Sequence, residues 1–126
     1  VLGLLRDEIG LEPRWVVADV GSGTGIATEL FLRHGNTVFA VEPNEAMRRA
    51  AERRLGGHPG FRSVSGAAER TGLPPGTLDL VVAAQAFHWF DAEAAREEFA
   101  RVLRKPRRLA LIWNTRDKEA TAFLRD

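Results

Sequence analysis

A glycine-rich segment, residues 17–25 (VADVGSGTG), carries the residue types with the clearest chemical meaning in this chain. An apolar run leads into Asp19, and Gly21, Gly23 and Gly25 then follow in the spacing G-x-G-x-G. Glycine permits backbone with φ > 0 and the close approach of a ligand, and the start of a helix after such a turn favours negative charge. We therefore expect bare backbone N–H groups at this turn and a small, partly anionic ligand.

The spacing of the glycines argues against two common nucleotide sites. A dinucleotide-binding turn has Gly or Ala three places after its second glycine, where this chain has Ile26 or Thr28, depending on which glycine is counted first. A triphosphate-binding loop needs Gly-Lys-Ser/Thr, which does not follow these glycines. Glu42, at the end of the next apolar run, can instead accept hydrogen bonds from both hydroxyls of a ribose. These features indicate a nucleoside without a pyrophosphate.

The elements that must position these residues alternate between short strands and amphipathic helices. Strands are expected at 15–20, 37–41, 61–64, 78–84 and 109–113, and helices at 1–10, 26–35, from a cap at Asn44, and from a cap at Asp91 to Leu103. The expected buried stripes are Ile26, Ala27, Leu30 and Phe31 in one helix and Ala46, Met47, Ala50 and Ala51 in the next. This alternation predicts a doubly wound α/β fold, a parallel sheet with helices on both faces that binds its ligand beyond the carboxyl ends of the strands.

Composition limits the function classes. The chain has 126 residues, of which 44% are hydrophobic and 28% charged, as expected for a single domain spanning residues 1–126. It contains no cysteine, which excludes disulfides and thiolate metal sites, and no apolar run reaches the roughly 20 residues of a membrane span. We expect a cytoplasmic protein with no metal and no membrane partner. The formal charge of +1 favours no nucleic-acid partner, and the basic run from Arg101 to Arg108 is interpreted as charge at a helix C-terminus.

Four segments, in this order, resemble the successive motifs of class I S-adenosylmethionine-dependent methyltransferases. They are Asp19–Gly25, Val41–Met47, Gly66–Arg70 with Leu73 and Pro74 just beyond, and Asp79–Asp91. The last segment is most similar to the branch that includes ubiquinone/menaquinone-biosynthesis and trans-aconitate methyltransferases. The resemblance covers residues 15–114. It implies a Rossmann-like sheet of strand order 3-2-1-4-5, S-adenosylmethionine as cofactor with S-adenosylhomocysteine as product, and in-line methyl transfer to an oxygen or carbon of a small molecule.

The resemblance also implies roles for single residues in cofactor binding. The turn formed by Gly21, Ser22, Gly23, Thr24 and Gly25 would hold the methionine part, and Asp19 would orient that turn or the ammonium group. Glu42 would bind the ribose. Pro43 and Ala68 would flank the adenine together with Ala67 and Glu69, and the backbone of Ala84 and Gln85 would face the methionine amino group. Two plainer interpretations stay open: Asp19 as a partner of the helix N-terminus only, and Glu42 as a solvated strand end.

Phe87, His88 and Trp89 follow the fourth strand and would face the methyl acceptor. His88 is the candidate general base, because the pKa of histidine suits proton transfer near neutral pH. Packing of this aromatic cluster in the core or in a lid is the alternative. The segment lacks the Asn/Asp-Pro-Pro-aromatic sequence of methyltransferases that act on base amino groups, which favours a small-molecule acceptor.

The end of the chain departs from the family pattern. A Pro-Gly-Gly turn often precedes the fifth strand, whereas this chain has Lys105-Pro-Arg-Arg108, so we expect a turn that avoids positive φ. The chain stops at Asp126, soon after Asn114, and we expect it to lack the family's C-terminal antiparallel hairpin. The fifth strand would then expose an unpaired edge, through which the chain would form a homo-oligomer unless it is a C-terminally incomplete piece of a longer enzyme. A non-catalytic cofactor-binding module and a nucleotide-dependent oxidoreductase are the remaining alternatives.

Overall fold

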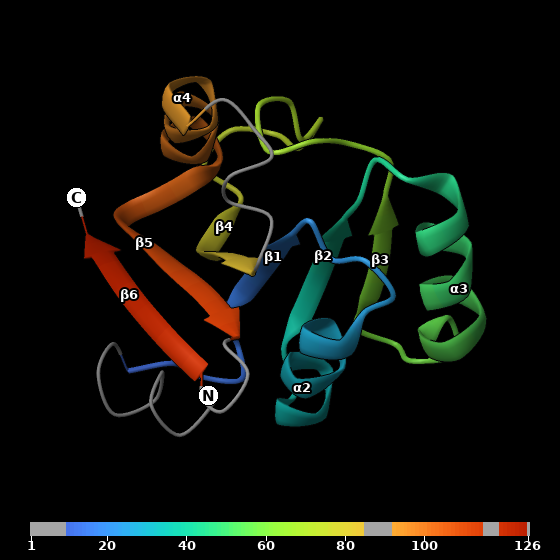
Figure 1. The fold of residues 1–126 in the computed structure, drawn as a ribbon. Helices are drawn as coiled ribbons and strands as arrows, with labels where there is room; N and C mark the ends of the chain where they lie inside the picture. Colours follow the sequence, from blue (N-terminus) through green and yellow to red (C-terminus); the bar gives the residue numbers. More distant parts are fainter. Residues whose placement is uncertain (1–9, 85–91, 115–118, 126) are drawn as a thin grey trace.

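The computed structural model describes residues 10–84, 92–114 and 119–125 (Figure 1). Its elements are β1 (Val16–Val20), α2 (Ile26–His34), β2 (Thr37–Val41), α3 (Glu45–Leu55), β3 (Phe61–Val64), β4 (Leu78–Ala84), α4 (Ala92–Val102), β5 (Leu103–Asn114) and β6 (Glu119–Arg125). The expected bounds of the second, third and fourth strands are confirmed. Of the expected first helix only Gly10 is described, and the expected cap Asp91 lies outside the described residues.

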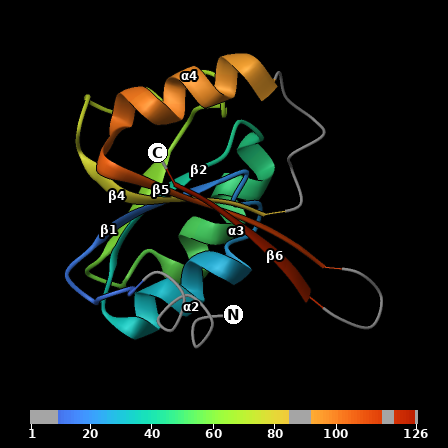
Figure 2. The ribbon, with the colours of Figure 1, turned by 90° about the vertical axis from the view of Figure 1, so that its left-hand side faces the viewer.

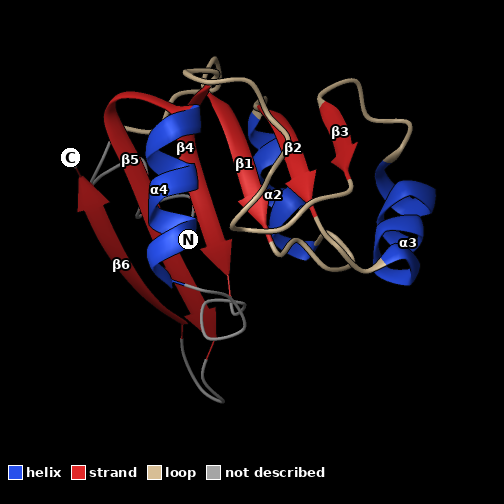
Figure 3. Ribbon diagram, turned by 90° about the horizontal axis from the view of Figure 1, so that it is seen from above, coloured by secondary structure: helices blue, strands red, loops and turns tan. Residues whose placement is uncertain are grey.

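One twisted sheet runs through the molecule in the strand order β3-β2-β1-β4-β5-β6. The first five strands are parallel, which confirms the predicted order 3-2-1-4-5, and Figure 3 shows β3 and β6 at the two ends of the sheet. Because β1 lies between β2 and β4, the chain reverses its direction of winding beside the carboxyl end of β1. This is the place where open α/β sheets bind ligands.

Helices cover both faces of the sheet, as Figure 2 shows with α4 on one side and α2 on the other. Phe31 and Leu32 of α2 pack with Val17, Val38 and Leu80 on one face. The other face buries the α4 residues Ala95, Phe99 and Val102 against strand residues that include Ala18, Val20 and Val81. Successive strand residues point to opposite faces, so each of the strands β1 to β5 contributes to both cores.

The predicted helix ends are confirmed at two places. Gly35 ends α2 with φ 107° and donates its N–H to the Leu32 carbonyl, and the Asn44 side chain accepts a hydrogen bond of 3.0 Å from the Met47 N–H at the start of α3. Within the described part of the chain, no helix is long and apolar enough to cross a bilayer.

The predicted buried stripes of α2 and α3 are wrong in part. Ile26 and Leu30 are 73% and 42% exposed, because α2 turns the i, i+3, i+4 set Thr28, Phe31 and Leu32 to the sheet instead. In α3, Ala51 and Leu55 are buried, but Met47 is 45% exposed at the free end of that stripe.

The fifth strand differs from the prediction in its start. β5 begins at Leu103, directly after α4, and residues 104–107 bulge between the pairs Leu78↔Leu103 and Leu80↔Arg108. The expectation that this stretch avoids positive φ is wrong, since Arg107 has φ 50°. A bulge commonly carries such a conformation at one position.

The expectation that no antiparallel strand follows the fifth strand is also wrong. β6 pairs antiparallel with β5 from Arg108↔Arg125 to Asn114↔Glu119. The chain after Asn114 thus supplies the backbone partners that the β5 edge requires. Self-association through an unpaired fifth strand therefore loses its structural basis.

Candidate functional site

The glycine turn lies at the carboxyl end of β1 and leads directly into α2. Gly21, Gly23 and Gly25 have φ values of 72°, 60° and 92°, so all three adopt the positive-φ conformation that the glycine spacing predicts. Gly25 has a second constraint, because a Cβ at this position would lie 2.7 Å from Leu55 Cδ1 of α3. The turn is therefore packed tightly against the end of α3.

Four backbone N–H groups of this turn are not bare, which corrects the prediction at those positions. Gly21 and Ser22 donate to the Val41 carbonyl at 2.8 and 3.2 Å, and Gly25 donates to the Ser22 carbonyl at 3.0 Å. Gly23 donates to Oε1 of Glu42 at 2.7 Å. The turn closes on the end of β2, so polar side chains rather than these N–H groups are left to contact a ligand.

Glu42 joins the ends of β1 and β2. It is 8% exposed, so the interpretation as a solvated strand end is wrong. Besides the bond from Gly23, its Oε2 accepts a hydrogen bond of 3.0 Å from the Asn44 N–H. A carboxylate has about four acceptor positions, so about two remain after these bonds. The group is fixed in place and can still accept further donors.

Asp19 is the most buried charged group of the site, with 1% of its surface exposed. Its Oδ2 accepts a hydrogen bond of 2.6 Å from the Thr28 hydroxyl, whereas Oδ1 is buried without a hydrogen-bond partner among the described residues. Burial raises the pKa of this carboxyl from 3.8 to about 6, hydrogen bonding from Thr28 opposes the rise, and the nearby charge of Glu42 adds to it. Asp19 thus does serve the first turn of α2 and also has one free acceptor.

Helix α3 holds the glycine turn through a residue that sequence reasoning missed. Arg54 donates to the Thr24 carbonyl at 2.7 Å and to Glu29 of α2 at 2.5 Å. An arginine in the last turn of a helix is ordinarily read as a partner of the helix dipole, so the sequence carries no specific signal for this role.

The residues expected around the adenine form a tight turn after β3. Ala67 and Arg70 exchange backbone hydrogen bonds of 3.1 and 3.0 Å. Ala68 is 4% exposed and packs in the α4 core, while Ala67 and Glu69 are half-buried. Pro43 is exposed just beyond Glu42. These positions follow β2 and β3, and therefore lie at the same edge of the sheet as the glycine turn.

The remaining expected site residues stand at the end of β4 or follow it in the sequence. The backbone of Ala84 ends β4 and pairs with Ile112 of β5. Gln85, Phe87, His88 and Trp89 lie outside the described residues.

The acceptor groups at this edge suit a ligand that is cationic at one end and carries hydroxyls at the other. Asp19 Oδ1 is a buried acceptor without a partner among the residues described, and a cationic N–H donor would satisfy it. Glu42 can accept hydroxyl hydrogens from a ribose. The α-amino group and ribose of S-adenosylmethionine meet both requirements.

Comparison with known proteins agrees with this geometry. A family pattern described as "Methyltransferase domain" matches residues 18–111, which include the glycine turn, Glu42 and the turn after β3. The chain belongs to this methyltransferase family. The membership confirms the class I methyltransferase resemblance seen in the four sequence motifs.

Relatives of this methyltransferase domain occur in bacteria and fungi. Uncharacterized methyltransferase Rv3342 of Mycobacterium tuberculosis is 41% identical over 102 residues, which cover 81% of this chain and 41% of the relative. Uncharacterized methyltransferase-like C25B8.10 of Schizosaccharomyces pombe is 32% identical over 114 residues, or 90% of this chain and 43% of the relative. The domain therefore spans about two fifths of the length of these curated relatives.

Solved structures share the fold of this methyltransferase domain. A SAM dependent methyltransferase from Aquifex aeolicus superimposes with a TM-score of 0.81 and 26% identity over 92% of this chain and 66% of its own. A protein of Anabaena variabilis described as "Putative methyltransferase from antibiotic biosynthesis pathway" gives a TM-score of 0.78 with 30% identity over 89% of this chain and 44% of its own.

Proposed function

We propose that this methyltransferase domain binds S-adenosylmethionine at the carboxyl ends of β1 and β2 and supports transfer of the methyl group to an oxygen or carbon atom of a small molecule. The observation that carries the proposal is the buried pair of carboxylates at the switch point. Glu42 is fixed by Gly23 and Asn44 with acceptor positions to spare, and Asp19 has an unpartnered oxygen among the described residues. Family membership and the solved neighbours support the same cofactor.

Bound S-adenosylmethionine would supply a methyl group already activated on a sulfonium, so the task of the protein is alignment and the exclusion of water. In this proposal Glu42 accepts hydrogen bonds from the ribose hydroxyls, and Asp19 Oδ1 accepts one from the ammonium group. Gly21–Gly25 would border the methionine part, and the backbone of Ala84 and Gln85 would face its amino group. The adenine lies between Pro43 and the turn that contains Ala67, Ala68 and Glu69.

The acceptor side rests on the sequence of the segment after β4. Phe87 and Trp89 would shape an apolar acceptor site, and His88 would remove a proton from a hydroxyl or an acidic carbon when the acceptor has one. A carboxylate acceptor needs no base. The similarity of this segment to ubiquinone/menaquinone-biosynthesis and trans-aconitate methyltransferases supports small-molecule acceptors of these kinds. The cytoplasmic location and the lack of a nucleic-acid partner stay predictions from composition.

Calorimetric titration with S-adenosylhomocysteine tests the cofactor site. We expect Glu42→Ala to weaken binding by about 1.5–3 kcal/mol, the size of a hydrogen bond to a charged group. Glu45→Gln is the matched control, because it removes a negative charge from the exposed first turn of α3 without touching the site. Since Glu42 also holds Gly23, urea unfolding of each variant separates loss of contact from loss of fold.

Two results would overturn the proposal: no binding by the parent chain, or equal affinity in the Glu42→Ala variant. A parallel titration with NAD tests the oxidoreductase alternative. A methyl-transfer assay against carboxylate and phenol acceptors then distinguishes an enzyme from a non-catalytic cofactor-binding module, which would bind S-adenosylhomocysteine without turnover.

A further inference from the structure

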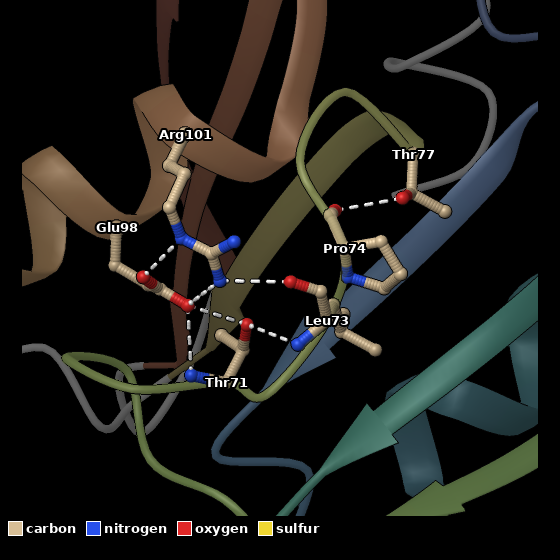
Figure 4. A network of polar contacts seen from close by, with 6 residues as sticks. All are labelled: Thr71, Leu73, Pro74, Thr77, Glu98 and Arg101. Carbon is tan, nitrogen blue, oxygen red and sulfur yellow. Dashed lines mark hydrogen bonds and ion pairs between the residues drawn. The ribbon is translucent and has the colours of Figure 1, made fainter.

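The segment between β3 and β4 is fastened to α4 by a network of polar contacts (Figure 4). Oε2 of Glu98 accepts hydrogen bonds from both the backbone N–H and the hydroxyl of Thr71, at 2.9 and 2.7 Å. Arg101 donates to both oxygens of Glu98 at 2.9 and 2.7 Å and also to the Leu73 carbonyl at 2.8 Å. One carboxylate thus fixes the position of Thr71, and its arginine partner fixes the next turn of chain.

Thr71 closes the turn that is proposed to take the adenine. A Cβ at Gly66 would lie 2.9 Å from the Thr71 carbonyl oxygen, so the start of the turn rests on its end. Between them, Ala67 and Arg70 exchange backbone hydrogen bonds. The position of Thr71 therefore sets the position of Ala67 and Ala68 relative to Glu42.

The hydrogen bonds between Glu98 and Thr71 are shielded from water. Thr71 is 1% exposed, and the Glu98 side chain is 10% exposed, so water has little access to compete for the carboxylate. The Arg101 guanidinium first, and the hydrogen bonds from Thr71 after it, lower the pKa of Glu98 to about 2 despite the opposing effect of burial. Glu98 is ionised at every pH at which the protein would be assayed.

We infer that Glu98 is a positioning residue for cofactor binding: through Thr71 it sets the turn from Gly66 to Arg70 against which the adenine of S-adenosylmethionine would lie. The inference rests on the proposed function. Glu98 itself is on α4 and hydrogen-bonds Thr71, which follows the turn, so it would act on the ligand only through the backbone of that turn.

Two ligands separate an effect on the adenine turn from a general loosening. S-adenosylhomocysteine carries the nucleoside and the amino-acid part, whereas 5′-deoxy-5′-methylthioadenosine carries only the nucleoside. We expect Glu98→Ala to weaken both by the same factor, about tenfold, the order of one hydrogen bond to a charged group. The exposed neighbour Glu97 on the same helix gives the matched control, and Glu97→Ala should bind both ligands as the parent does.

The conservative variants identify Thr71 as the link. The amide oxygen of Glu98→Gln can still accept from Thr71 but without charge, so this variant should recover part of the lost affinity. Thr71→Val should weaken binding, and adding Glu98→Ala to it should cost less than in the parent, because the two residues act through one contact. If Glu98→Ala fails to fold, Glu98→Gln and Thr71→Val carry the test.

The outcomes distinguish failure of the positioning role of Glu98 from failure of the proposed function. Parent-like affinity of Glu98→Ala for both ligands would overturn the positioning role and leave the proposed function intact. A larger loss for S-adenosylhomocysteine than for methylthioadenosine would also overturn it, since the loosening would then reach the amino-acid end. Failure of the parent to bind either ligand would overturn the proposed function, and the inference with it.

Discussion

The buried carboxylate of Asp19 predicts how the stability of the free chain depends on pH. Burial raises its pKa from 3.8 to about 6 in the folded chain, so between these values the folded state holds a proton that the unfolded state has lost. The contribution of Asp19 to the free energy of unfolding is therefore fully present below about pH 4. It falls as pH rises, until the folded carboxyl also ionises near pH 6. Above that pH the penalty is constant.

The size of the penalty follows from the shift. The difference of 6 − 3.8, or about 2 pKa units, corresponds to about 3 kcal/mol at 1.36 kcal/mol per unit. Asp19→Asn keeps the shape of the side chain and an acceptor for Thr28 but cannot ionise. Because the unfolded carboxyl is already more than half ionised at pH 4, we expect the stability of Asp19→Asn relative to the parent to increase by about 2.4 kcal/mol of this total between pH 4 and pH 7.

Urea unfolding of both chains at half-unit pH steps from 4 to 8 measures this difference. Glu45→Gln, at an exposed position, controls for the change in net charge. A difference between parent and Asp19→Asn that stays flat over this range would show that Asp19 is not held in a buried site of raised pKa, and the structural account of the switch point would be refuted.

Two further predictions concern ligand and turnover. Because a cationic group beside Oδ1 of Asp19 favours the ionised carboxylate, S-adenosylhomocysteine should bind more tightly as pH rises from 5 to 7 and should release a proton on binding near pH 6. The Asp19→Asn variant should show neither effect. Calorimetry in two buffers of different ionisation enthalpy measures both effects, and pH-independent binding by the parent would contradict the placement of the ammonium group. His88→Gln should lower turnover of the complete enzyme on the order of 10²-fold with cofactor affinity unchanged, whereas a packing role predicts lower thermal stability with normal turnover per folded molecule.

Strand positions could be predicted because their signal is local. The runs that form β2 and β4 are short, largely apolar and bounded by polar residues, and β3 keeps an apolar residue at each end and follows a glycine; the bounds of all three match the prediction. The buried face of α2 could not be predicted by the same means. Thr28 faces the sheet because its hydroxyl pairs with Asp19, and a hydrophobic period counts a threonine as surface.

The candidate site was predictable in its residue types and less so in its contacts. The glycines adopt the positive φ that their spacing indicated. The bond from Gly23 to Glu42 joins residues 19 positions apart, and the one from Thr71 to Glu98 joins residues 27 apart. Such pairs depend on how strands and helices pack, which local patterns do not encode. Glu98 was not singled out from the sequence; its i, i+3 spacing from Arg101 is compatible with an ion pair on a helix, but nothing in that spacing points to Thr71.

The closed glycine turn also determines whether the entropy cost of ordering the site arises during folding or during ligand binding. Four of its N–H groups are already bonded inside the protein, and Gly25 is wedged against α3. The backbone freedom of this turn is therefore lost when the chain folds and not when a ligand arrives. Preorganisation of this kind leaves more of the contact energy available as affinity. It also means that changes at the C-terminal end of α3, where Arg54 and Leu55 contact the turn, can alter affinity by loosening the turn.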